Sequence, residues 1–139
     1  MRVVQFKSVD DKALDWEVEI VAVIGKTARQ VTAADAMDHV FGFTATQDLT
    51  AKDWAARNGG QLVMSKNFDA FCPLGPCVVT KEEFGDLRDV RLRTWVNGEL
   101  KQDGNSANMV HGVPQIIEYL TRLVLEPFME QYSRENPTP

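Results

Sequence analysis

The stretch DWEVEIVAVIG, residues 15–25, decides how this chain folds. Its second half is rich in Val and Ile and ends at a glycine, which predicts a β-strand over residues 17–24. Alternate side chains of a strand point to the same face, so Glu17 and Glu19 should converge on one point. Two carboxylates at that separation repel each other unless a proton or a cation lies between them. The pair therefore indicates either a site for a hard divalent cation such as Mg2+ or an edge strand that carries two solvated glutamates.

The bulk composition is that of one globular domain. The chain has 139 residues, of which 44% are hydrophobic and 25% charged, enough to build a real core. The net charge is −5 and no long basic run occurs, which argues against a nucleic-acid partner. No apolar stretch reaches roughly 18 residues, so we expect no membrane span. The N-terminal residues lack the features of a secretory signal.

The cysteines and histidines do not form a recognisable site. A zinc centre at Cys72 and Cys77 would need two further ligands, and nothing in the sequence pairs these thiols with His39 or His111. Two thiols in a chain of this size fit a reducing compartment better than a disulfide framework. We interpret both histidines as structural, so the sequence identifies no histidine that would act as a general base.

Local patterns predict the remaining secondary structure. In chain order, the predicted elements are a strand at residues 2–9, a helix opening at Thr32, a strand at 40–47, a helix at 50–57, strands at 89–96 and 99–102, and a helix at 113–125. Asn97-Gly98, between the last two strands, is a strong signal for a type I′ hairpin turn. Thr50 and Asp53 have the spacing of a capping box at the start of a helix. Residues 61–75 look irregular, with a buried strand near 62–64.

The composition changes near the end of the chain. Residues 127–139 are polar and proline-rich, and we expect them to form a disordered tail. No internal repeat or linker divides the rest. The predicted organisation is one domain over residues 1–126 followed by this tail.

Four sequence blocks resemble the catalytic domain of the fumarylacetoacetate hydrolase family. They are DWEVE at residues 15–19, GF with DLTAKD within 42–53, SKNFD with CPLGP within 65–76, and VNGE at 96–99. The blocks follow the family order at family-like spacing and cover residues 15–125. Together they are far more specific than any one of them, and they favour the metal interpretation of the glutamate pair.

The resemblance implies a fold and a metal site. The expected fold is α+β and mostly β, with rolled mixed β-sheets around a metal site, a few short helices and an incomplete domain. Glu17, Glu19 and Asp48 are the implied metal ligands, and the implied cofactor is Mg2+, or Mn2+ or Ca2+ in its place. The resemblance also implies a homodimer.

Two lysines are the implied catalytic residues. Lys66 could hold a substrate carbonyl or a developing oxyanion beside the metal, although a solvated loop lysine is the alternative. Lys52 stands where the family carries arginine, and lysine cannot form the same two-pronged contact with a carboxylate. It could equally be a solvated helix lysine. Asp53 is expected to pair with a basic residue or to cap the helix.

The chain also departs from the family pattern. Family members carry a histidine-containing segment before the glutamate pair and a T-G-T-P-x-G-V-G loop near the end, and neither occurs here. We therefore expect the middle part of a family domain, in a cytoplasmic or mitochondrial location inside the cell.

The expected activity is that of a divalent-metal-dependent hydrolase or lyase acting on small 2-oxo or 1,3-diketo acids. The candidate reactions are acylpyruvate hydrolysis and oxaloacetate decarboxylation or tautomerisation, and the sequence does not choose among these substrates. Decarboxylation needs only an electron sink, without a group that activates water. The alternative is a catalytically inactive, truncated family member that acts only through subunit association.

Overall fold

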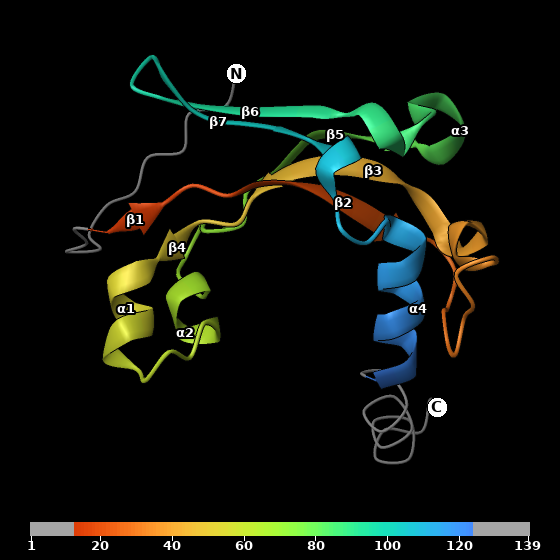
Figure 1. Ribbon diagram of the computed structural model, residues 1–139, viewed down its shortest axis with the longest axis horizontal. Helices are drawn as coiled ribbons and strands as arrows, with labels where there is room; N and C mark the ends of the chain where they lie inside the picture. The colour runs from red at the N-terminus through yellow and green to blue at the C-terminus, as the bar shows by residue number, and fades with distance from the viewer. Residues whose placement is uncertain (1–12, 124–139) are drawn as a thin grey trace, which may run out of the picture.

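The computed structural model describes residues 13–123 (Figure 1). The predicted strand at 2–9 and the predicted tail at 127–139 lie outside these residues. The strands are β1 (Leu14–Asp15), β2 (Val18–Ile24), β3 (Val40–Gln47), β4 (Thr50–Ala51), β5 (Leu74–Thr80), β6 (Arg91–Val96) and β7 (Glu99–Asn105). The helices are α1 (Lys52–Arg57), α2 (Val63–Lys66), α3 (Lys81–Phe84) and α4 (Val113–Leu123), with 3-10 turns η1 (Ala36–His39), η2 (Leu87–Asp89) and η3 (Ser106–Asn108). The expected α+β, mostly β architecture is confirmed.

A three-stranded antiparallel sheet in the order β2-β3-β5 forms the centre of the molecule. The hairpin β6-β7 lies above this sheet, α1 and α2 lie below one end, and α4 lies below the other (Figure 1). Strand β3 approaches β5 so closely that a Cβ on Gly42 would lie 2.2 Å from the Val79 carbonyl oxygen, which requires glycine there. In the part of the chain that the structure describes, β2 is an edge strand of this sheet.

The described residues form two apolar clusters. The larger includes Val40 and Phe43 of β3 and Ile117 of α4, all less than 9% exposed. The smaller contains Leu49, Ala51 and Phe71. Because residues 49 and 51 flank Thr50, burial of this smaller cluster fixes the backbone just after Asp48.

The hairpin and the last helix are confirmed. Asn97 and Gly98 have positive φ angles of 51° and 84°, as a type I′ turn requires. Helix α4 begins at Val113, with Pro114 in its first turn, and buries Ile117 against the larger cluster. No helix among residues 13–123 is long and apolar enough to cross a membrane.

Two predicted helix starts are wrong. The Thr32 hydroxyl donates to Asp35 Oδ2 at 2.7 Å, within a turn that precedes the 3-10 helix η1. Thr50 lies in β4 rather than at a helix cap, and α1 begins at Lys52 without a side-chain cap. Neither hydroxyl caps a helix. The Thr32 hydroxyl donates to the Asp35 side chain, and the Thr50 hydroxyl donates to the Asp48 backbone carbonyl.

The buried strand predicted near residues 62–64 is also wrong. Val63 and Met64 belong to α2, and with Leu62 they are 49–61% exposed. The irregular region predicted through residue 75 ends at Leu74, where β5 begins and pairs with β3. The apolar composition of residues 62–64 suggested burial, but tertiary contacts bury Ser65 instead.

Candidate metal centre

The pairing of β2 with β3 brings three carboxylates together. Val18 lies opposite Gln47 and Glu19 opposite Thr46, and the Asp48 backbone N–H donates to the Glu17 carbonyl at 2.8 Å. Asp48 is therefore the cross-strand neighbour of Glu17. One carboxylate oxygen from each of Glu17, Glu19 and Asp48 lies within 4.8 Å of the others. The structure thus assembles the three predicted ligands at one end of the central sheet.

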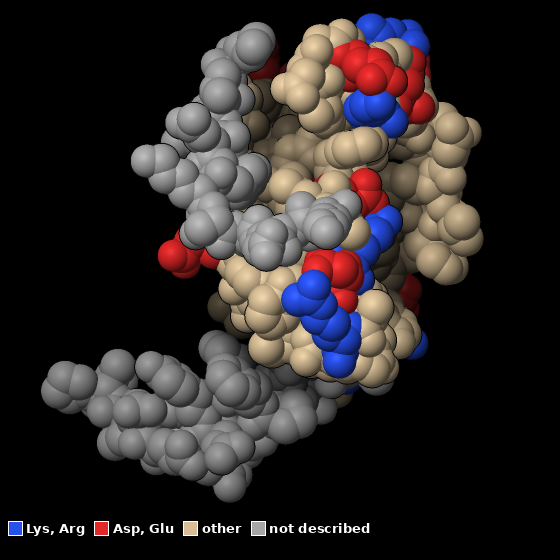
Figure 2. All heavy atoms as spheres, turned by 90° about the vertical axis from the view of Figure 1, so that its left-hand side faces the viewer, with Lys and Arg blue, Asp and Glu red and all other residues tan. Residues whose placement is uncertain are grey.

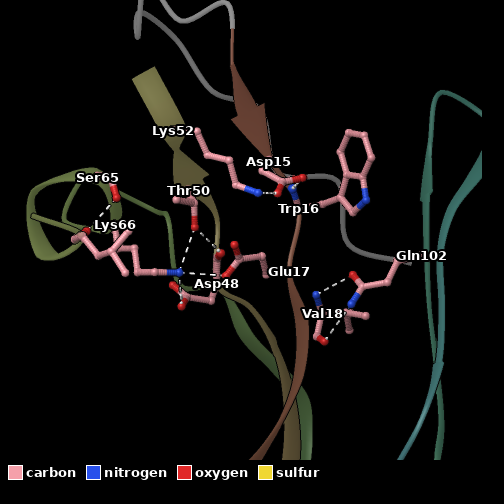
Figure 3. Close-up of polar contacts among 11 residues, drawn as sticks. Asp15, Trp16, Glu17, Val18, Asp48, Thr50, Lys52, Ser65, Lys66 and Gln102 are labelled. Atoms are coloured by element: carbon pink, nitrogen blue, oxygen red, sulfur yellow. Dashed lines mark hydrogen bonds and ion pairs between the residues drawn. The ribbon is translucent and has the colours of Figure 1, made fainter. Parts of the chain in front are cut away.

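Lys66 supplies a positive charge to this cluster from α2. Its Nζ lies 2.8 Å from Glu17 Oε2 and 2.6 Å from Asp48 Oδ2, and it donates to Thr50 Oγ1 at 2.9 Å (Figure 3). The preceding residue, Ser65, is fully buried and its hydroxyl donates to the Leu62 carbonyl at 2.6 Å. This anchor holds the last turn of α2 so that Lys66 points at the carboxylates.

The electrostatics of the cluster are unbalanced. Burial, followed by the negative charges of Asp48 and Glu17, raises the pKa of Glu19, and Lys66 only partly offsets this. Burial would lower the pKa of Lys66, but hydrogen bonds to Asp48 and Glu17 outweigh it and the pKa lies above its usual value. Three carboxylates therefore share one ammonium group, and the site can accommodate further positive charge.

The donor set fits a hard divalent cation. Mg2+, Mn2+ and Ca2+ bind carboxylate oxygens, and three converging carboxylates are a suitable set. The Lys66 ammonium, bonded to two of the three, shows that these oxygens already converge on a cation.

The structure places Lys52 differently from Lys66. Its ammonium forms an ion pair with Asp15, and the hydrogen bond and charge of Asp15 raise the pKa of Lys52 (Figure 3). The Lys52 side chain is 57% exposed. Asp53 pairs with Arg57 at 2.8 Å, one of the two roles expected for it.

Two further residues, Thr50 and Gln102, contact the cluster or its backbone and were not predicted to do so. Thr50 accepts a hydrogen bond from Lys66 and donates to the Asp48 carbonyl at 3.1 Å. Its position two residues after Asp48 could have indicated this, because alternate residues of an extended segment share a face. Gln102 binds the backbone of Val18, and no local pattern indicates a contact over 84 residues.

The histidines and cysteines lie in other parts of the fold. His39 ends η1, and its backbone carbonyl accepts a hydrogen bond from the Gly25 N–H at 2.8 Å. His111 lines a hollow formed largely by α4. Cys72 and Cys77 are exposed thiols, and Cys72 Sγ lies 3.3 Å from Thr46 Oγ1.

Acidic and basic side chains are interspersed on the face that carries α1 and α2 (Figure 2). Neither sign forms an extended patch over the part of this face that is described. The charged groups on this side of the molecule therefore form small local clusters of both signs.

The chain is similar to known proteins in sequence and in fold. The family model described as fumarylacetoacetate hydrolase C-terminal matches residues 2–128. The mitochondrial oxaloacetate tautomerase Fahd2a of Rattus norvegicus is 42% identical over 115 residues, and its human counterpart FAHD2A is 45% identical over 112. These alignments cover 83% and 80% of this chain but only 37% and 36% of the relatives.

A solved structure shows the same fold. The 2-hydroxyhepta-2,4-diene-1,7-dioate isomerase of Mycobacterium marinum superposes with a TM-score of 0.76 at 36% sequence identity. The superposition covers 83% of this chain and 44% of that one. The chain therefore belongs to the fumarylacetoacetate hydrolase family.

Proposed function

We propose that this chain carries the metal-binding part of an enzyme that acts on small 2-oxo acids, with oxaloacetate as the leading substrate. The observation that supports this most directly is the convergence of Glu17, Glu19 and Asp48 on one point beside the Lys66 ammonium. The rat and human relatives are named oxaloacetate tautomerases, which favours oxaloacetate over other 2-oxo acids.

Glu17, Glu19 and Asp48 would hold Mg2+, with Mn2+ or Ca2+ as alternatives. A bound divalent cation would act as a Lewis acid toward the carbonyl and carboxylate oxygens of the substrate. The carboxylates contribute the negative charge that retains the ion. The contact of Lys66 with two of them means that binding of an ion would redistribute its hydrogen bonds.

Lys66 has a separate role in the proposed chemistry. In keto–enol conversion of oxaloacetate, a proton leaves the methylene carbon, a carbon–carbon double bond forms, and the carbonyl oxygen gains a proton. Negative charge develops on that oxygen, and a fixed ammonium group stabilises it. The raised pKa of Lys66 keeps this group charged at neutral pH, so it acts as an electrostatic stabiliser rather than as a base.

Decarboxylation of oxaloacetate and hydrolysis of acylpyruvates are the other reactions we propose for this site. Both develop charge on a carbonyl-derived oxygen, so Lys66 would serve them in the same way. Lys52 is a secondary candidate, because its charge interacts with both Glu17 and Lys66, but it must leave Asp15 to hold a substrate carboxylate.

The test is turnover of oxaloacetate and acetylpyruvate by the purified chain with Mg2+ or Mn2+, beside the Glu17→Gln/Glu19→Gln double variant. Enol formation, carbon dioxide release and acetylpyruvate loss are followed separately, with and without EDTA. Metal-dependent turnover that the double variant loses supports the proposal. A folded chain that binds metal but turns over neither substrate would favour the alternative, a catalytically inactive family member acting through subunit association.

We also propose a homodimer located in the cytoplasm or mitochondria. Large apolar side chains that lie exposed on the described surface, such as Trp95 at 56% and Tyr119 at 65%, are consistent with a buried interface in an assembly. Both mammalian relatives are named mitochondrial. Sedimentation equilibrium of the purified chain tests the dimer, and a monomer at all concentrations would contradict it.

A further inference from the structure

Glu19 lies in β2 and Glu17 directly precedes it, and among residues 13–123 β2 is an edge strand of its sheet. The Glu17 carbonyl faces β3, where it accepts from Asp48, so the peptide groups of Val18 point away from β3. Val18 lies between Glu17 and Glu19 in the sequence. The backbone conformation of Val18 therefore sets how the two glutamates are placed relative to each other.

The side chain of Gln102 binds both outward groups of Val18. The Val18 N–H donates to Gln102 Oε1 at 2.8 Å, and Gln102 Nε2 donates to the Val18 carbonyl at 3.3 Å (Figure 3). An amide side chain thus takes the place that the peptide of a neighbouring strand would take in a sheet. The Val18 N–H and carbonyl, which lie on the outer edge of β2 between the two carboxylates, thus both have hydrogen-bond partners.

Gln102 is itself held by a contact within the β6-β7 hairpin, and a further hydrogen bond joins that hairpin to the central sheet. It lies opposite Thr94 in the β6-β7 hairpin, and the Thr94 hydroxyl donates to Gln102 Oε1 at 3.4 Å. Gln47 Nε2 donates to the same hydroxyl at 2.6 Å. Since Gln47 precedes Asp48 and pairs with Val18, one polar network reaches the backbone beside all three carboxylates. Thr94 is 8% exposed, so water competes poorly for these bonds.

We propose that Gln102 is a positioning residue for the metal centre, acting with Thr94 and Gln47 to hold the Glu17-Val18-Glu19 backbone. Its hydrogen bonds among the described residues go to Val18 and Thr94 and not to the three carboxylates, so it acts through the backbone between Glu17 and Glu19. Such outer contacts set the orientation of metal ligands, and their loss weakens metal binding about tenfold or more. This inference rests on the metal site of the proposed function.

The test is the Mn2+ affinity of the full chain, measured by electron paramagnetic resonance at a temperature where each variant is fully folded. Gln102→Met keeps the side-chain length but removes both hydrogen bonds, and we expect binding about tenfold weaker with an altered Mn2+ spectrum. Gln115→Met, the same change on α4, is the matched control and should bind as the wild type does. Equal affinity for Gln102→Met and wild type would overturn the inference while leaving the proposed function intact.

Two further measurements keep the test decisive if Gln102→Met does not fold. Thr94→Val removes only the linking hydroxyl, and we expect a smaller loss, roughly threefold; unchanged affinity would count against the network. In the wild type, hydrogen exchange should show a protected Val18 amide, and free exchange there would exclude the Gln102 contact. A wild-type chain that does not bind Mn2+ overturns the proposed function and this inference with it.

Discussion

Removing the charge of Glu19 should stabilise the metal-free chain and abolish its response to metal. Glu19 has two carboxylate neighbours with oxygens within 4.8 Å, and it makes no direct contact with Lys66 among the described contacts. At that distance and the dielectric constant of water, each like-charge neighbour costs about 0.9 kcal/mol. Attraction to Lys66 and screening by salt offset part of this. We therefore expect Glu19→Gln to raise the free energy of unfolding by about 1 kcal/mol, or Tm by about 4 °C.

Bound metal should make the wild type more stable than Glu19→Gln, the reverse of the difference expected without metal. A ligand at 100 times its Kd stabilises the folded state by about 2.7 kcal/mol, so saturating Mn2+ should make the wild type more stable than the variant. Without its third carboxylate, Glu19→Gln should show no Mn2+-dependent rise in Tm. Glu17→Gln is the matched control, because it removes the same charge but also an ion pair with Lys66 at 2.8 Å. Its metal-free stabilisation should be smaller or absent.

The pH dependence has a defined sign. Because the pKa of Glu19 is raised in the folded chain, its carboxylate lowers stability above that pKa, and the cost disappears when acidification protonates the group. The advantage of Glu19→Gln should therefore be largest near neutral pH and shrink as the pH falls. Differential scanning calorimetry with EDTA and with Mn2+ measures both effects. A metal-free Glu19→Gln chain less stable than wild type, or one that Mn2+ stabilises as strongly, would refute this reasoning.

Three other perturbations test separate parts of the structure. Gly42→Ala should lower the free energy of unfolding by about 1–3 kcal/mol, because its Cβ would lie 2.2 Å from the Val79 carbonyl oxygen. Urea unfolding measures this loss, and unchanged stability would show that β5 moves away without cost. Lys66→Met should tighten Mn2+ binding, because it removes a cation that competes for Glu17 and Asp48, and should reduce turnover about 100-fold or more. Calorimetric titration measures the Mn2+ affinity, and weaker binding by the variant would contradict this expectation. Arg91 lowers the pKa of Asp103 to about 2. Wild type should therefore exceed Asp103→Asn in stability above about pH 4, and the difference should shrink as the pH falls and vanish below about pH 2. Urea unfolding across this range would contradict the ion pair if the difference did not change with pH.

Several features of the fold follow from short-range patterns. The type I′ turn needs two consecutive residues with positive φ, and Asn97-Gly98 is a sequence that accepts this at little cost. The helix at α4 follows from apolar residues at helical spacing. Errors occurred where a hydroxyl had several partners within reach: Thr32 bonds to Asp35, and Thr50 to Asp48 and Lys66. Local spacing does not choose among such partners, because the choice depends on which groups the tertiary fold brings near.

The residue pattern alone predicts an extended segment over 17–24 with Glu17 and Glu19 on one face, because the period of two is a property of extended backbone. The strand observed, β2, begins one residue later, at Val18. The surroundings of these two carboxylates depend on tertiary packing. Asp48 faces Glu17 through the antiparallel register of β2 and β3, and Lys66 arrives on a helix where apolar composition suggested a buried strand. Gln102 reaches Val18 across 84 residues. These contacts depend on how separate elements pack against one another. The residues that pack together come from distant parts of the chain, so no short segment of sequence predicts them.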